Sequence, residues 1–112
     1  MDKKIYVVTA KISKNVDVLY YVFSDKNYFN AFVDCVEYEK DGDYDEMYET
    51  VSALQEEKGM FQNMSEEMLE YIGDYDLNEI FSNTYELASS AAEFKRLSDG
   101  CEIVSEANVS MF

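Results

Sequence analysis

The chain has 112 residues, 47% of them hydrophobic, and a formal net charge of −15 with no histidine. This hydrophobic content supports a folded core, so the acidity does not indicate a disordered chain, and the length predicts one domain over residues 1–112. An acidic surface repels nucleic acid and anionic membranes and attracts basic proteins or cations. Because no apolar run reaches the roughly 20 residues of a membrane-spanning helix, we expect no membrane association.

Residues 5–12 and 16–23 predict an N-terminal β-hairpin, because both segments are rich in Val, Ile and Tyr and the polar "SKN" lies between them. One face of the first strand would carry Tyr6, Val8, Ala10 and Ile12. The second strand has apolar residues on both faces, which predicts a position inside the sheet. Thr9 and Lys11 interrupt the apolar stretch, so we interpret it as a mature strand rather than a signal peptide and expect a cytoplasmic protein.

Helices are expected to follow the hairpin. The first runs from a cap at Ser24 or Asp25 to about Lys40, and Gly42 ends it. Its apolar stripe has helical spacing and consists of Tyr28, Phe29, Phe32, Val33 and Val36. The second helix covers about residues 45–57. Its inward residues are Met47, Val51 and Leu54.

Gly59 ends this second helix, and "MFQNM" connects it to a third helix that Ser65 caps and Gly73 breaks. The inward residues of the third helix are Met68, Leu69 and Ile72. The following "DLNEIF" adds another helical turn. Thr84 is expected to cap a fourth helix. Its inward residues are Leu87, Ala91, Phe94 and Leu97.

The C-terminal segment predicts a third strand. Gly100 closes the fourth helix, and residues 101–112, "CEIVSEANVSMF", have the composition of a strand. The expected fold class is therefore α+β, with a small antiparallel sheet, made of the hairpin and the C-terminal strand, packed against about four short helices.

Two acidic, tyrosine-bearing stretches share the sequence "GDYD": "EYEKDGDYDEMYE" at residues 37–49 and "EYIGDYD" at residues 70–76. Residues 34–79 hold sixteen acids and two lysines. Helix termination and capping explain part of this pattern, because Gly ends one helix and Asp caps the next. It does not explain like charges at helical spacing, where each pair costs about 0.2–0.5 kcal/mol. Such repulsive trios are Glu66, Glu70 and Asp74, and Asp34, Glu37 and Asp41.

The sequence has no catalytic signature. Without histidine, general acid–base catalysis would have to use carboxylates, Tyr or Lys. The paired carboxylates of this sequence lie in solvated segments whose like charges repel one another. We therefore expect no enzymatic activity, no catalytic residue and no cofactor. Cys35 and Cys101 are far apart and unaccompanied by a second pair, which predicts two buried thiols rather than a zinc site or a disulfide.

A calcium loop is the nearest metal motif. Asp41, Asp43 and Asp45 match the first three ligands of an EF-hand loop. That loop requires Gly at its sixth position and Glu at its twelfth, where this chain has Glu46 and Ser52. We therefore expect no metal site, although weak and non-specific binding of divalent cations stays open.

Carboxylates on helices can reproduce the linear charge density of DNA. DNA carries one charge per roughly 3.4 Å of each strand, and carboxylates three or four residues apart on a helix lie about 4.5–6 Å apart along its axis. A basic DNA-binding cleft would accept such an array in place of phosphates. Interleaved tyrosines would add flat contact area on which Arg can stack, or else cover the helices as half-buried side chains. These tyrosines are Tyr38, Tyr44, Tyr48, Tyr71 and Tyr75.

In length, charge and acidic tyrosine-bearing helices, the chain resembles small single-domain α+β inhibitors encoded by phages and mobile elements, including DNA-mimicking anti-CRISPR and anti-restriction proteins. This resemblance rests on composition and assigns no individual residue. It implies an inhibitor in the host cytoplasm that occupies the basic DNA-recognition surface of a CRISPR effector nuclease or another host nucleic-acid enzyme, without binding nucleic acid directly. The partner-binding residues predicted within residues 34–79 are Asp34, Glu37, Tyr38, Asp41, Asp43, Tyr44, Asp45, Glu46, Tyr48, Glu49, Glu66, Glu70, Tyr71, Asp74, Tyr75 and Asp76.

Two other interpretations stay open. The chain could be an acidic protein–protein interaction module without DNA mimicry, such as an antidote to a basic toxin or a phage regulatory partner. Adaptation to high salt also produces acidic surfaces, but it spreads the acids over the whole protein, whereas residues 1–26 hold five lysines and three acids.

Overall fold

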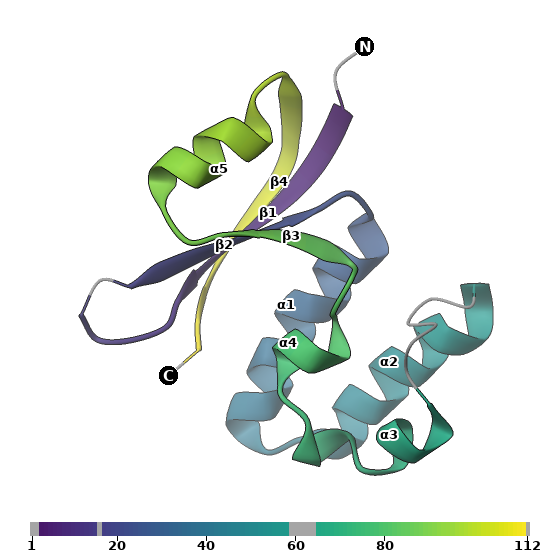
Figure 1. The fold of residues 1–112 in the computed structure, drawn as a ribbon. Helices are drawn as coiled ribbons and strands as arrows, with labels where there is room; N and C mark the ends of the chain where they lie inside the picture. Colours follow the sequence, from purple (N-terminus) through teal and green to yellow (C-terminus); the bar gives the residue numbers. More distant parts are fainter. Residues whose placement is uncertain (1–2, 16, 59–64, 112) are drawn as a thin grey trace. The chain divides into compact units, whose positions relative to one another are not determined.

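The computed structural model describes residues 3–15, 17–58 and 65–111 (Figure 1). The chain divides into two compact units. The sheet unit combines Met1–Phe29 with Asn83–Phe112, and the helical unit is Asn30–Ser82. Each unit is described by itself below. The predicted roles of Gly59 and of the "MFQNM" connector fall outside the described residues.

A four-stranded sheet in the order β3-β2-β1-β4 forms the centre of the sheet unit (Figure 1). Its strands are β1 (Lys3–Lys11), β2 (Val18–Phe23), β3 (Tyr85–Ala88) and β4 (Cys101–Ser110). The first two pair antiparallel, which confirms the hairpin, and β2 lies inside the sheet as predicted. The combination of this sheet with separate helices confirms the α+β class.

The sheet is mixed rather than antiparallel, which corrects one expectation. Strand β4 runs parallel to β1, from the pair Lys3 and Cys101 to the pair Lys11 and Ser110. Parallel neighbours need a crossover connection. The helix α5 (Ala91–Ser98) provides it, because it connects β3 at one edge of the sheet with β4 at the other (Figure 1).

The helix expected from Thr84 onwards is wrong in its first part, where the chain forms β3 instead. The helix begins six residues later, because the Ser90 hydroxyl accepts a hydrogen bond from the Glu93 N–H at 3.1 Å. Serine followed three residues later by glutamate is a capping signature that the longer apolar pattern obscured. Leu87 is therefore a strand residue with 47% of its side chain exposed, and Ala91 is exposed as well.

Both faces of the central strands are buried. On one face Ile5, Val7 and Val22 form a cluster against α5. The α5 residues Phe94 and Leu97, which were expected to point inward, pack on this cluster. On the other face of the sheet, the residues of β1 and β2 that are fully buried are Val8, Ala10, Tyr21 and Phe23. Ile12, predicted to share this face, lies beyond the end of β1 and is 39% exposed.

Local signals define the helix α1 (Lys26–Asp41), which begins in the sheet unit and continues into the helical unit. The Asp25 carboxylate accepts a hydrogen bond from the Asn27 N–H at 2.7 Å, so Asp25 rather than Ser24 is the cap. At the other end, Gly42 has φ 73°. The Gly42 N–H donates to the Glu39 carbonyl and the next N–H donates to the Tyr38 carbonyl, which is the hydrogen-bond pattern of a Schellman cap.

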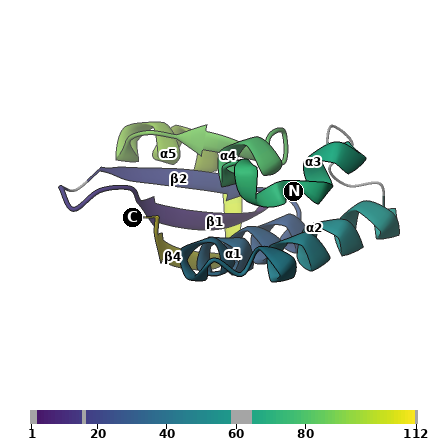
Figure 2. The ribbon, with the colours of Figure 1, turned by 90° about the horizontal axis from the view of Figure 1, so that it is seen from below.

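Four further elements complete the helical unit (Figure 2). They are α2 (Tyr44–Lys58), α3 (Glu66–Glu70), the short 3-10 helix η1 (Ile72–Asp74) and α4 (Leu77–Ile80). Ser65 caps α3 as predicted, by accepting from the Met68 N–H at 3.2 Å. The core of the unit includes Phe32 and Phe81, whose rings meet edge to face at 5.3 Å between centroids. Its other fully buried residues of α1, α2 and α4 are Val36, Cys35, Met47, Val51 and Leu77.

None of the helices among the described residues is long and apolar enough to cross a membrane.

Candidate acidic binding surface

All sixteen predicted partner-binding residues belong to the helical unit. This unit holds sixteen acids and two lysines, a formal net charge of −14, whereas the sheet unit holds eight acids and seven bases. The protein's net charge is therefore almost entirely a property of the helical unit. A general requirement for solubility would spread the acids over both units.

Most of the predicted carboxylates are exposed. Among the described side chains these are Asp34, Glu37, Asp41, Asp43, Asp45, Glu46, Glu49, Glu70, Asp74 and Asp76. The backbone of Glu66 begins α3, but its side chain lies outside the described part. Within that part, no lysine or arginine forms an ion pair with these carboxylates.

One of the exposed carboxylates, that of Asp76, stabilises the start of a helix. The Asp76 carboxylate accepts a hydrogen bond from the Glu79 N–H at 2.9 Å and so caps α4. The suggestion that some aspartates of the "GDYD" repeats serve as helix caps is therefore confirmed for Asp76. The side chain of Asp43, just before α2, makes no hydrogen bond within the described residues.

The two acidic stretches meet in a groove of about 360 Å³ between α2 and the segment that contains α3 and η1. Its lining residues are Tyr44, Asp45, Tyr48, Leu69, Glu70, Tyr71, Ile72, Gly73 and Asp74. Six of these nine residues were predicted from sequence. The groove joins part of the first stretch with part of the second, and we call it the tyrosine groove.

Sequence reasoning missed three residues of the tyrosine groove. Leu69 and Ile72 were assigned to the core, and both are buried, but they also line the base of the groove. Gly73 was expected to break a helix, whereas it lies inside η1. A Cβ atom at Gly73 would lie 3.0 Å from Cγ of Tyr44, so any larger residue there would require the Tyr44 ring to shift by a few tenths of an ångström. The repetition of "GDYD" was the signal that could have drawn attention to Gly73.

A second group of acids surrounds Tyr38, at the junction of α1 and α2. Partial burial raises the pKa of the Tyr38 hydroxyl, and the carboxylates of Asp34, Glu46 and Asp43 raise it further. These three carboxylates therefore act on the same phenol although up to twelve residues separate them in sequence. Neither this group nor the tyrosine groove includes Glu37, Asp41 or Glu49, which are exposed elsewhere on the unit.

The carboxyl group of Glu39 is destabilised in its ionised form by burial and by a neighbouring acid of the same unit. Burial raises the pKa of this carboxyl group, and the neighbouring Asp76 carboxylate raises it further. The folded state therefore binds a proton at Glu39 more tightly than the unfolded chain does. The ionised side chain destabilises the fold at neutral pH, and this effect disappears as the pH falls through the raised pKa.

We therefore expect Glu39→Gln to raise Tm at pH 7 by about 1–3 °C, because one repulsive contact costs about 0.2–0.5 kcal/mol. The gain should shrink as the pH is lowered toward the ordinary carboxyl pKa of 4.5. Thermal unfolding at several pH values measures this, with Glu102→Gln on the sheet unit as a control that should change nothing. A gain that is constant between pH 4 and pH 7 would contradict the assignment.

Cys35, the cysteine of the helical unit, offers no reactive thiol to this surface. Both cysteines are free, with Cys35 buried as predicted and Cys101 half-buried. Burial raises the pKa of the Cys35 thiol to about 12, and the nearby carboxylates of Asp34 and Glu39 act in the same direction. The thiolate, which is the reactive form, is therefore strongly disfavoured at Cys35.

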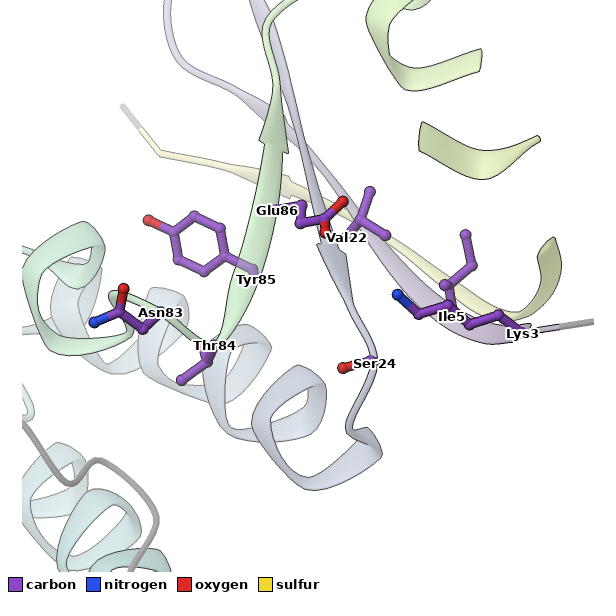
Figure 3. A pocket seen from close by; sticks show the side chains of 8 residues that line it. All are labelled: Lys3, Ile5, Val22, Ser24, Asn83, Thr84, Tyr85 and Glu86. Carbon is purple, nitrogen blue, oxygen red and sulfur yellow. The ribbon is translucent and has the colours of Figure 1, made fainter. Parts of the chain in front are cut away.

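A smaller pocket of about 160 Å³ lies in the sheet unit (Figure 3). It is lined by Lys3, Ile5, Val22, Ser24, Asn83, Thr84, Tyr85 and Glu86. One lysine and one glutamate balance its charge, and it contains none of the predicted site residues. The helical unit therefore remains the stronger candidate for partner binding.

No protein-family model, no curated protein and no solved structure matches this chain.

Proposed function

We propose that the protein is a non-enzymatic inhibitor that binds the basic DNA-recognition surface of a nucleic-acid enzyme, such as a CRISPR effector nuclease or a restriction system, and mimics DNA. The observation that carries this proposal is the concentration of a net charge of −14 in the helical unit, with its carboxylates exposed. The partner is a basic protein, since a surface of this charge repels nucleic acid.

The spacing of the exposed carboxylates supports mimicry of a charged strand. Asp34, Glu37 and Asp41 follow one another on α1, and Asp45 and Glu49 follow one another on α2. At 1.5 Å per residue, neighbouring carboxylates in such a row lie about 4.5–6 Å apart along the helix axis. The carboxylates within each row are therefore somewhat more widely spaced than the phosphates of one DNA strand, which are roughly 3.4 Å apart, and a DNA-binding cleft is already arranged to bind such charges.

The second candidate function is an interaction module that binds a basic protein without imitating DNA. The tyrosine groove favours this alternative, because aromatic rings in a hollow suit protein side chains and have no counterpart in a phosphate backbone. The two functions differ in whether DNA and the protein compete for one surface of the partner.

A competition assay tests the proposal. The partner is captured from a lysate of bacteria that carry CRISPR and restriction systems, and its binding is then measured with and without duplex DNA at 50 and 200 mM salt. We expect DNA to displace the protein, and the affinity to fall at least about 100-fold between the two salt concentrations. Simultaneous binding of DNA and protein would overturn DNA mimicry and leave the interaction module.

A further inference from the structure

We infer that the tyrosine groove receives an arginine side chain of the partner. This inference rests on the proposed function, because it takes the partner to be a basic protein, and it adds which side chain is recognised and where. The groove's exposed rings, its shape and the charge at its rim each support this assignment.

The exposed tyrosines of the protein are all in this groove. Of the ten tyrosines, only Tyr44, Tyr48 and Tyr71 are more than a third exposed, at 44%, 43% and 57%. The other seven are buried or half-buried. Half-buried cover over the helices is therefore a sufficient explanation for Tyr38 and Tyr75, but not for the three tyrosines of the groove.

The three tyrosines line this groove from two segments of the backbone. Tyr44 and Tyr48 are four residues apart on α2, so their side chains lie on the same face of the helix. Tyr71 is the residue that follows α3, on the opposite wall. The Tyr44 ring packs on the backbone of Gly73, which restricts the position of this ring. The groove therefore brings together exposed aromatic side chains from two segments of the helical unit.

The size and base of the groove fit one extended side chain. Its volume of about 360 Å³ falls at the lower end of the range typical of ligand pockets. Leu69 and Ile72 provide an apolar base against which the methylene groups of a long side chain can pack.

The charge at the rim selects a cation. Asp45 lies on the α2 side, Glu70 and Asp74 lie on the other side, and no lysine or arginine is among the lining residues. Arginine fits this combination better than lysine, because its planar guanidinium group can stack on a ring and donate hydrogen bonds in its plane to carboxylates. The lysine ammonium group is compact and strongly hydrated, and gains less from the rings.

Titration with peptides tests the inference on the intact protein. An arginine hexapeptide and a lysine hexapeptide are added separately, while NMR follows the ring resonances of Tyr44, Tyr48 and Tyr71. We expect both peptides to bind the acidic unit, the arginine peptide at least about fivefold more tightly, and ring resonances of the groove to shift with it.

Variants locate the binding site of the arginine peptide. Tyr48→Ala and Tyr71→Ala should each weaken its binding about tenfold, whereas Tyr48→Phe, which keeps the ring, should weaken it at most twofold. Leu87→Ala removes a comparably exposed apolar side chain from the sheet unit and is the matched control. Far-UV circular dichroism establishes that each variant is folded.

The outcomes separate this inference from the proposed function. Equal affinities for the two peptides, or arginine-peptide affinities unchanged by the tyrosine-to-alanine variants, would overturn the arginine site even if the protein competes with DNA for its partner. Selective binding of the arginine peptide in the groove, combined with no competition between the protein and DNA, would support the arginine site and overturn DNA mimicry.

Discussion

Phe32→Ala is expected to lower the free energy of unfolding by about 3–5 kcal/mol, the usual cost of removing a fully buried aromatic ring. Phe32 has no exposed surface, and its ring meets that of Phe81 edge to face at 5.3 Å. Truncation removes this ring pair and leaves a cavity in the core of the helical unit. Since small domains are stable by about 5–15 kcal/mol, the variant would be close to unfolding. Urea denaturation followed by far-UV circular dichroism measures the change.

Two further variants complete this experiment. Leu87→Ala, at a side chain with 47% exposure, should change the free energy of unfolding by less than about 0.5 kcal/mol. Phe23→Ala removes a fully buried ring of the sheet unit. Because α1 runs through both units without interruption, we expect Phe23→Ala and Phe32→Ala to shift one and the same transition. Two separate transitions would contradict the single domain predicted over residues 1–112.

The helices that sequence predicted well are those with local start and stop signals. Asp25, the apolar stripe of α1 and Gly42 lie within one segment, and each acts through neighbours in the chain. The same is true of Ser65 before α3. Caps and helical periodicity are readable from sequence because the groups that satisfy them are at most a few residues apart.

The parts of the sheet that sequence predicted poorly depend on distant partners. The segment Tyr85–Ala88 forms a strand because it pairs with the free edge of β2, more than sixty residues earlier in the chain. Similarly, the parallel direction of β4 follows from the crossover through α5. Strand pairing of this kind has no local signal in a four-residue segment, and the apolar spacing of Leu87 and Ala91 was compatible with a helix.

The features of the candidate surface also divide into those that sequence predicted and those that depend on distant contacts. Composition alone located the charge, since every predicted acid falls in the helical unit. It did not show that Tyr44 and Tyr48 face Tyr71 across a groove, because this requires α2 to pack against η1. It also could not distinguish these exposed rings from Tyr38 and Tyr75, which are half-buried.

Neutralising four acids at the start of α2 is expected to weaken binding to the basic partner at least about 100-fold. The changes are Asp43→Asn, Asp45→Asn, Glu46→Gln and Glu49→Gln. Each neutralised carboxylate removes a charge-assisted hydrogen bond, which is worth about 1.5–3 kcal/mol where it is made. The slope of log affinity against log salt should also become less steep, by roughly one unit for each ion pair with the partner that the variant no longer makes. Affinity measurements from 50 to 200 mM salt give both quantities.

The same variant should remain folded. Asp45 and Glu46 lie in the first turn of α2, where each favours the positive end of the helix dipole by about 0.3–1 kcal/mol. Their removal also relieves repulsion with neighbouring acids, which costs about 0.2–0.5 kcal/mol per pair. Because the two effects oppose each other, we expect the free energy of unfolding to change by less than about 1 kcal/mol. The weaker binding would then come from the surface and not from unfolding.

A matched variant tests whether binding depends on the position of the carboxylates or only on the total charge. Neutralising four exposed acids of the sheet unit changes the total charge by the same amount. These changes are Asp17→Asn, Glu86→Gln, Glu102→Gln and Glu106→Gln. If partner recognition depends on an ordered row of carboxylates on the helical unit, this variant should bind within about threefold of the original protein. Equally weakened binding in the two variants would mean that only total charge matters, and the assignment of DNA mimicry to the helical unit would then be wrong.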